Sequence, residues 1–119
     1  MAFDRSSRRR LTRHSARLFP EDTLFHRIAR VVCEAECLPR KELFEAWEVA
    51  KRVRRRMRGR PVVELCAGHG LLSHLMLVLD DSTPTAVCVD TREPPSAARI
   101  GAALTEAWPR LAGRVEYRQ

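Results

Sequence analysis

A short apolar run, a glycine-rich turn and an apolar helix follow one another between residues 61 and 79, and this order constrains the fold most. Residues 61–66 are short, β-branched and apolar, as in strands that are buried on both faces of a parallel sheet. Gly68 and Gly70 then interrupt the run, and residues 71–79 are apolar nearly all round, which predicts a buried helix. This order predicts the start of a parallel βαβ unit.

The alternation of strand and helix continues to the last residue of the sequence. Residues 85–90 predict a second buried strand that ends on Asp90. Residues 94–107, which open with two prolines, predict a further helix, and residues 114–118 predict the beginning of a third strand. Elements of this length imply parallel strands joined by right-handed crossovers. We therefore expect an α/β fold in which residues 61–119 form a partial Rossmann-like domain.

Two amphipathic helices are expected before this domain. Acidic and capping residues at 21–23 predict the start of the first helix, and Pro39 predicts its end. The second is expected from near Arg40 to a C-cap at Gly59. Its apolar stripe consists of Leu43, Trp47, Ala50, Val53 and Met57. We divide the chain into a basic flexible arm (1–20), a helical N-terminal extension (21–60) and the α/β part (61–119).

The positive charge is concentrated before residue 61. Residues 1–60 hold 17 basic and 8 acidic residues, a balance of +9, whereas residues 61–119 hold 5 basic and 7 acidic ones. The arginine-rich run Arg52–Arg60 has two interpretations. It could bind the phosphates of RNA, or it could be a solvated helix end that complements the helix dipole. A basic nucleic-acid-binding module on a degenerate Rossmann scaffold is therefore the alternative function.

Composition limits the location of the protein. No apolar run approaches the roughly 20 residues needed to span a bilayer, and the N-terminus lacks the apolar centre of a secretory signal. The four cysteines lie in apolar or helical patterns rather than in loops, which favours reduced thiols. We expect a cytoplasmic protein without a membrane partner.

The glycine turn is suited to holding a ligand. Gly68 can adopt backbone angles closed to other residues, and amides at the start of the next helix favour a negative group. Asp90 follows Gly68 by 22 residues, close to the spacing of about 20 at which an acid binds both ribose hydroxyls. Dinucleotide sites also require a third glycine, where this chain has Ser73. An acid, Glu64, lies instead within the first strand, four residues before Gly68.

Glu64-Leu65-Cys66-Ala67-Gly68-His69-Gly70 resembles the acid-x-x-x-Gly-x-Gly motif of class I S-adenosylmethionine-dependent methyltransferases. Val87-Cys88-Val89-Asp90 is similar to the second-strand motif of that family, and the similarity covers about residues 60–119. The resemblance implies a Rossmann-like methyltransferase half-domain with three parallel strands. It also implies a transferase enzyme with S-adenosylmethionine as its cofactor.

The resemblance assigns a role to each part of the site. Amides from Gly68 to Leu71 would hold the cofactor carboxylate, Glu64 would offset its ammonium group, and Asp90 would hold the ribose. Thr91 and Arg92 would lie near the adenine. The expected cofactor-binding residues are Glu64, Cys66, Ala67, Gly68, His69, Gly70, Leu71, Asp90, Thr91 and Arg92.

The chain departs from the family pattern after its third strand. The substrate-side motif of the family follows strand four, whereas this sequence stops in or just after strand three. The methyl acceptor and the catalytic residues are therefore not assigned, and this portion need not be active alone. An open sheet edge is expected to cause aggregation or self-association, or to indicate a longer gene product. No metal site is expected, although Cys33 and Cys37 share a helix face with His26.

Overall fold

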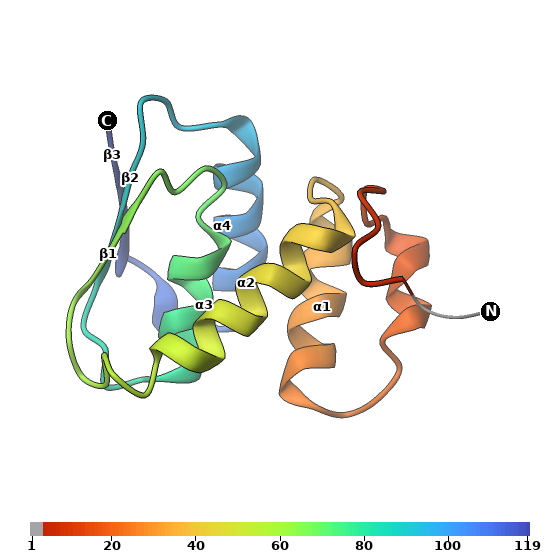
Figure 1. Ribbon diagram of the computed structural model, residues 1–119, viewed down its shortest axis with the longest axis horizontal. Coiled ribbons are helices and arrows are strands. Elements are labelled where there is room, and N and C mark those ends of the chain that lie inside the picture. Colours follow the sequence, from red (N-terminus) through yellow and green to blue (C-terminus); the bar gives the residue numbers. More distant parts are fainter. Residues whose placement is uncertain (1–3) are drawn as a thin grey trace.

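The computed structural model describes residues 4–119 of the chain (Figure 1). Its elements are η1 (Arg13–Leu18), α1 (Leu24–Ala35), α2 (Arg40–Val53), β1 (Val62–Leu65), α3 (Leu71–Leu79), β2 (Ala86–Val89), α4 (Pro95–Ala107), η2 (Pro109–Leu111) and β3 (Val115–Arg118). Within these residues, none of the helices combines the length and the apolar character needed to cross a membrane.

The three strands form one parallel sheet in the order β1-β2-β3. The register pairs Glu64 of β1 with Cys88 of β2, and Cys88 with Tyr117 of β3. The predicted three-stranded parallel sheet with intervening helices is thus confirmed. The carboxyl ends of the strands lie at one edge of the sheet, which is where the glycine turn and Asp90 follow β1 and β2.

Helices cover only one face of this sheet (Figure 1). The expectation that β1 is buried on both faces is wrong, because Val63 is 60% exposed and Leu65 is 71% exposed. Val62 and Ala86, whose side chains point to the opposite face, are buried. Both faces of β1 carry apolar side chains, but the helices of the described residues cover only one of these faces. The outer edge of β1 also has no strand beside it in residues 4–119.

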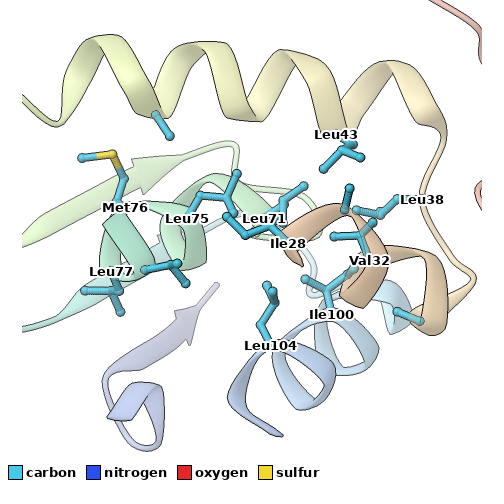
Figure 2. Close-up of a cluster of buried hydrophobic side chains, with 14 of the residues drawn as sticks. Ile28, Val32, Leu38, Leu43, Leu71, Leu75, Met76, Leu77, Ile100 and Leu104 are labelled. Atoms are coloured by element: carbon cyan, nitrogen blue, oxygen red, sulfur yellow. The ribbon is translucent and has the colours of Figure 1, made fainter. Parts of the chain in front are cut away.

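The core lies between the sheet and the helices and joins both halves of the chain. Figure 2 shows Leu71 and Leu75 of α3 beside Ile28 and Val32 of α1, with Ile100 of α4 close by. All five side chains are fully buried. The α3 helix is buried almost all round, as predicted, because α2, α4 and the sheet surround it. The helical extension and the α/β part therefore share one hydrophobic core.

The first amphipathic helix matches its prediction, and the second ends early. Thr23 is the N-cap of α1, since its hydroxyl accepts a hydrogen bond from the His26 amide at 3.1 Å. The prediction that α2 continues to a cap at Gly59 is wrong, because the helix ends at Val53. The chain then tightens into a turn in which the Arg56 amide bonds to the Val53 carbonyl. Arginines crowded here would repel one another in a longer helix, which favours the turn.

The basic segment before α1 is packed against the helices rather than fully solvated as expected. Leu11 and Phe19 are each 1% exposed, and the Leu11 amide donates to the Leu38 carbonyl at 2.8 Å. Between them lies the short helix η1, which contacts α1. Two apolar side chains among many arginines thus suffice to hold residues 10–20 on the core. Residues 1–3 of the expected arm lie outside the described residues.

Candidate functional site

The turn between β1 and α3 is built from residues with left-handed backbone angles. Cys66, Gly68 and Gly70 have φ values of 55°, 56° and 74°. The Ala67 amide donates to the Val89 carbonyl at 3.1 Å, which ties the turn to the end of β2. We call residues 66–71 the glycine loop. Its position at the carboxyl edge of the sheet is the one that the sequence predicts.

Asp90 is attached directly to the glycine loop. Its Oδ2 atom accepts a hydrogen bond from the Gly68 amide at 2.8 Å, and its Oδ1 atom accepts one from the Thr91 amide at 2.7 Å. These backbone hydrogen bonds lower the pKa of the Asp90 carboxyl below its ordinary value. The acid at the tip of β2 is thus ionised at neutral pH and held against the loop.

Glu64 lies on the helix-covered face of β1 and is held by Ser73 of α3. The Oε1 atom of Glu64 accepts hydrogen bonds from the Ser73 amide at 3.1 Å and from the Ser73 hydroxyl at 2.7 Å. Burial raises the pKa of the Glu64 carboxyl, and the two hydrogen bonds from Ser73 oppose that rise. Sequence reasoning noted Ser73 only as a missing glycine and overlooked its role as the partner of Glu64.

The two glycines of the loop differ in their surroundings. A Cβ atom placed on Gly70 would lie 3.1 Å from the Cys88 Sγ atom and 3.6 Å from the Tyr117 ring. A Cβ atom on Gly68 would meet nothing within 4 Å. Gly70 is therefore needed for close packing of the loop on the sheet. Gly68 instead faces open space, where a ligand could approach the main chain.

His69 links the loop to the N-terminal extension. Its Nδ1 atom accepts a hydrogen bond from the Leu71 amide at 3.1 Å, and its Nε2 atom lies 3.3 Å from Glu42 Oε2 on α2. The sequence indicates that Glu42 is an acid in the first turn of a predicted helix, but no sequence pattern connects this residue to the glycine loop. Glu42 therefore joins the residues at this site that sequence reasoning missed.

Several amides expected to hold a ligand carboxylate already have acceptors within the chain. The Gly68 amide bonds to Asp90, the Gly70 amide to the Ala67 carbonyl, and the Leu71 amide to His69. Within residues 4–119, the amides of His69 and Leu72 have no acceptor. Of the four predicted amides only that of His69 is thus free, and the other free donor, Leu72, lies one residue beyond the predicted set.

The remaining predicted residues lie at the rim of the site. Thr91 and Arg92 are exposed and follow Asp90 directly, and Cys66 is an exposed free thiol at the end of β1. The structure thus brings Glu64, the glycine loop and Asp90 together at one sheet edge. Thr91 and Arg92 are adjacent to them but make no contact with Glu64 or the loop through a hydrogen bond or ion pair in the described residues.

The cysteine and histidine pairs noted in the sequence do not converge. In residues 4–119, no group of three or more His, Cys, Asp or Glu side chains could hold a metal ion. The Nδ1 atom of His26 accepts from the Glu21 amide at 3.0 Å, and Cys33 is fully buried. Burial raises the pKa of the Cys33 thiol to about 11, which makes it a poor nucleophile and a poor ligand.

No protein-family model matches the chain, and no curated protein or solved structure matches it significantly. The arrangement at the glycine loop must therefore be interpreted from its own geometry. It combines an ionised acid, a half-buried acid, free backbone amides and an open approach to Gly68.

Proposed function

We propose that the chain provides the cofactor-binding part of a class I S-adenosylmethionine-dependent methyltransferase. The observation that carries the proposal is the 2.8 Å hydrogen bond from the Gly68 amide to Asp90 Oδ2. It joins the acid at the tip of β2 to the glycine loop after β1, in a parallel sheet whose β1 also contains Glu64. These are the residues on which the resemblance to the family rests.

The chemistry of the loop fits the carboxylate of the cofactor. The free amides of His69 and Leu72 lie at the positive end of α3, where an anion is stabilised by the helix dipole. Gly68 leaves open space beside them. A carboxylate bound here would complete the hydrogen bonding of the first turn of α3, since the Leu72 amide is the one donor of residues 71–74 without another acceptor in the described residues.

The two acids fit the rest of the cofactor. Glu64 uses Oε1 for both hydrogen bonds to Ser73, and Oε2 has no hydrogen-bond partner in the described residues. Oε2 is therefore available to an ammonium group, directly or through a water molecule. A carboxylate has about four acceptor positions, and Asp90 uses three of them for the Gly68 amide and for the amide and hydroxyl of Thr91. It therefore retains capacity for one ribose hydroxyl, and rotation of the Thr91 hydroxyl would free a position for the second.

Ser73 favours this cofactor over a dinucleotide. A dinucleotide loop requires glycine at this position so that the helix can approach the strand closely. Here the amide and hydroxyl of Ser73 both bind Glu64, and glycine has no hydroxyl with which to do so. The pair also holds an acid beneath the loop, where a pyrophosphate would be repelled.

When bound, S-adenosylmethionine supplies an activated methyl group on a sulfonium centre. The residues of this chain would bind and orient the cofactor, which is the main contribution of a protein to an in-line transfer. Asp90 would fix the ribose, and the loop amides would fix the carboxylate at the other end. The methyl acceptor is not assigned to any residue described here.

Ligand-dependent stability of the full chain tests the proposal. We expect S-adenosylhomocysteine, the stable product of methyl transfer, to raise the melting temperature progressively as its concentration exceeds the dissociation constant, with the logarithm of that concentration. We expect NAD to leave the melting temperature unchanged. Stabilisation by NAD and not by S-adenosylhomocysteine would overturn the proposal.

A further inference from the structure

The far end of α2 forms a basic groove that does not involve the cofactor site. The groove has a volume of about 450 Å³. It is lined by Glu48, Lys51, Arg52, Arg55 and Arg56. We call these residues the α2 groove.

The backbone explains why these cations share one side. Arg52 lies in the last turn of α2, and the chain continues through a turn in which the Arg54 and Arg56 amides bond to the carbonyls of Ala50 and Val53. Spacings of three and four residues in a helix or helical turn bring side chains to the same side. The side chains of Arg55 and Arg56 therefore lie on the same side of the chain as that of Arg52, rather than being spread around the helix axis.

Acidic groups do not neutralise the α2 groove. Its one acid, Glu48, lies 3.0 Å from the Lys51 ammonium group. The hydrogen bond from Lys51 lowers the pKa of the Glu48 carboxyl, and the nearby charge of Arg52 adds to the effect. In residues 4–119, no carboxylate lies within 4.0 Å of the guanidinium groups of Arg52, Arg55 or Arg56. These three arginines thus form no ion pair, and the groove holds one acid for four cations.

A neighbouring groove shows the contrast. Arg54 and Arg58 line it together with Asp80 and Asp81, so two acids accompany two arginines there. The excess charge is therefore a property of the α2 groove and not of every arginine in the 52–60 run. This pair also provides a matched control, because both grooves lie on the same stretch of chain.

We propose that the α2 groove binds the phosphate backbone of nucleic acid. A guanidinium group presents a planar fork that matches two phosphate oxygens, and three such groups suit successive phosphates rather than one isolated anion. The groove contains no apolar side chain to insert among lipids, which argues against a membrane surface as its partner. Contacts to phosphate oxygens carry no sequence information, so binding through these arginines to the backbone should not depend on sequence.

The α2 groove and the glycine loop lie at opposite ends of α2. Glu42, which contacts His69 of the loop, precedes Arg52 in the last turn of α2 by 10 positions in the sequence. At 1.5 Å per helical residue, that separation is roughly 15 Å. Nucleic-acid binding can therefore be measured without any cofactor, and its outcome does not depend on the proposed methyltransferase function.

Salt-titrated fluorescence anisotropy with a labelled single-stranded RNA of mixed sequence tests the proposal on the full chain. The logarithm of the binding constant should fall with the logarithm of salt concentration, with a slope of about −0.7 for each phosphate neutralised. Three contacts predict a contribution of about −2 from the groove. The triple variant Arg52→Gln, Arg55→Gln, Arg56→Gln should lose that part of the slope and bind at least about tenfold more weakly near 0.1 M salt.

Two further variants make the result specific to the groove. The double variant Arg54→Gln, Arg58→Gln should keep most of the affinity and the slope, because acids accompany these arginines. Replacing Arg52, Arg55 and Arg56 with lysine should keep the slope but weaken binding, since lysine retains the charge without the fork. Circular dichroism checks that each variant is folded.

Three outcomes would overturn the proposal. The first is a triple glutamine variant that keeps the affinity and slope of the natural chain. The second is an equal loss in the Arg54, Arg58 control. The third is binding to vesicles containing phosphatidylserine that is tighter than binding to the RNA.

Discussion

The Nε2 atom of His69 lies 3.3 Å from the Oε2 atom of Glu42, so the first turn of α2 contacts the glycine loop. The Leu71 amide donates to Nδ1 of the same ring, which leaves the ring proton on Nε2, facing Glu42. Glu42 thus helps to fix the ring that caps one amide of α3. The helical extension is for this reason part of the candidate site as well as part of the core.

Glu42→Ala should loosen the glycine loop with little effect on global stability. The pair is partly exposed, so its loss should lower the free energy of unfolding by about 1 kcal/mol or less. The Leu71 amide should nevertheless exchange its hydrogen faster, because His69 is no longer held in place. Hydrogen exchange measures this directly. Glu45→Ala, which removes only a surface pair with Lys41, is the control and should leave the exchange of Leu71 unchanged.

Alanine at the two loop glycines should have different effects. At Gly68 it should cost about 1–2 kcal/mol, because only the left-handed backbone angle is strained. At Gly70 it should cost about 2–5 kcal/mol, since the added methyl group also crowds Cys88. Urea unfolding provides both values. Equal losses at the two positions would show that the packing beneath Gly70 is not as described.

Glu64→Gln should stabilise the chain near neutral pH. Burial raises the pKa of Glu64, so the folded state binds its proton more readily than the unfolded state does. The ionised carboxyl therefore costs stability at pH 7, and this cost vanishes below the ordinary value of 4.5, where both states are protonated. Unfolding at pH 7 and pH 4 should show a gain only at pH 7. Glutamine at the exposed Glu106 should show none.

The same Glu64→Gln variant should bind S-adenosylhomocysteine about tenfold more weakly, since a neutral amide cannot offset an ammonium charge. A gain in stability together with a loss of binding would identify Glu64 as a residue kept for its ligand. Unchanged binding would remove Glu64 from the proposed cofactor site.

His74 should make the fold sensitive to mild acid. Burial lowers its pKa below 6.5, and its Nδ1 atom lies 2.8 Å from the Gly70 carbonyl, to which it donates. The unfolded chain therefore binds more protons, and stability is lost as the pH falls through 6.5. Unfolding between pH 7 and pH 5 should show this decline, and His74→Gln should reduce it. His14→Gln, at an exposed position, is the control and should leave the decline in stability unchanged. If stability declined just as steeply in His74→Gln, the account of His74 would be contradicted.

The order of strands and helices was predictable because each element has its own local pattern. The period of the apolar residues changes at Pro61, and glycine and proline mark the turns. The exposure of Val63 and Leu65 was not predictable, because apolar periodicity shows what a strand can bury and not whether a helix covers it. The early end of α2 escaped prediction for a related reason, since its apolar stripe continues to Met57 although the helix stops at Val53.

The acids and glycines of the site were predictable from spacing, but their hydrogen bonds were not. Gly68 and Asp90 are 22 positions apart, and their contact follows from the parallel pairing of β1 with β2. The contact between Glu42 and His69 depends instead on how α2 packs across α3, which no local pattern encodes. The sequence therefore predicted the sheet edge but not the side chain that α2 contributes to it.

Calorimetric titration of the full chain with S-adenosylhomocysteine tests the central claim most directly. We expect the natural chain to bind and Asp90→Ala to bind at least about tenfold more weakly, because hydrogen bonds to a charged acceptor are lost. Asp90→Asn retains an acceptor for the Gly68 amide and separates loop structure from ribose binding, while the exposed Asp81→Ala should match the natural chain. An absence of binding by the natural chain, or an unchanged affinity in Asp90→Ala, would contradict the account.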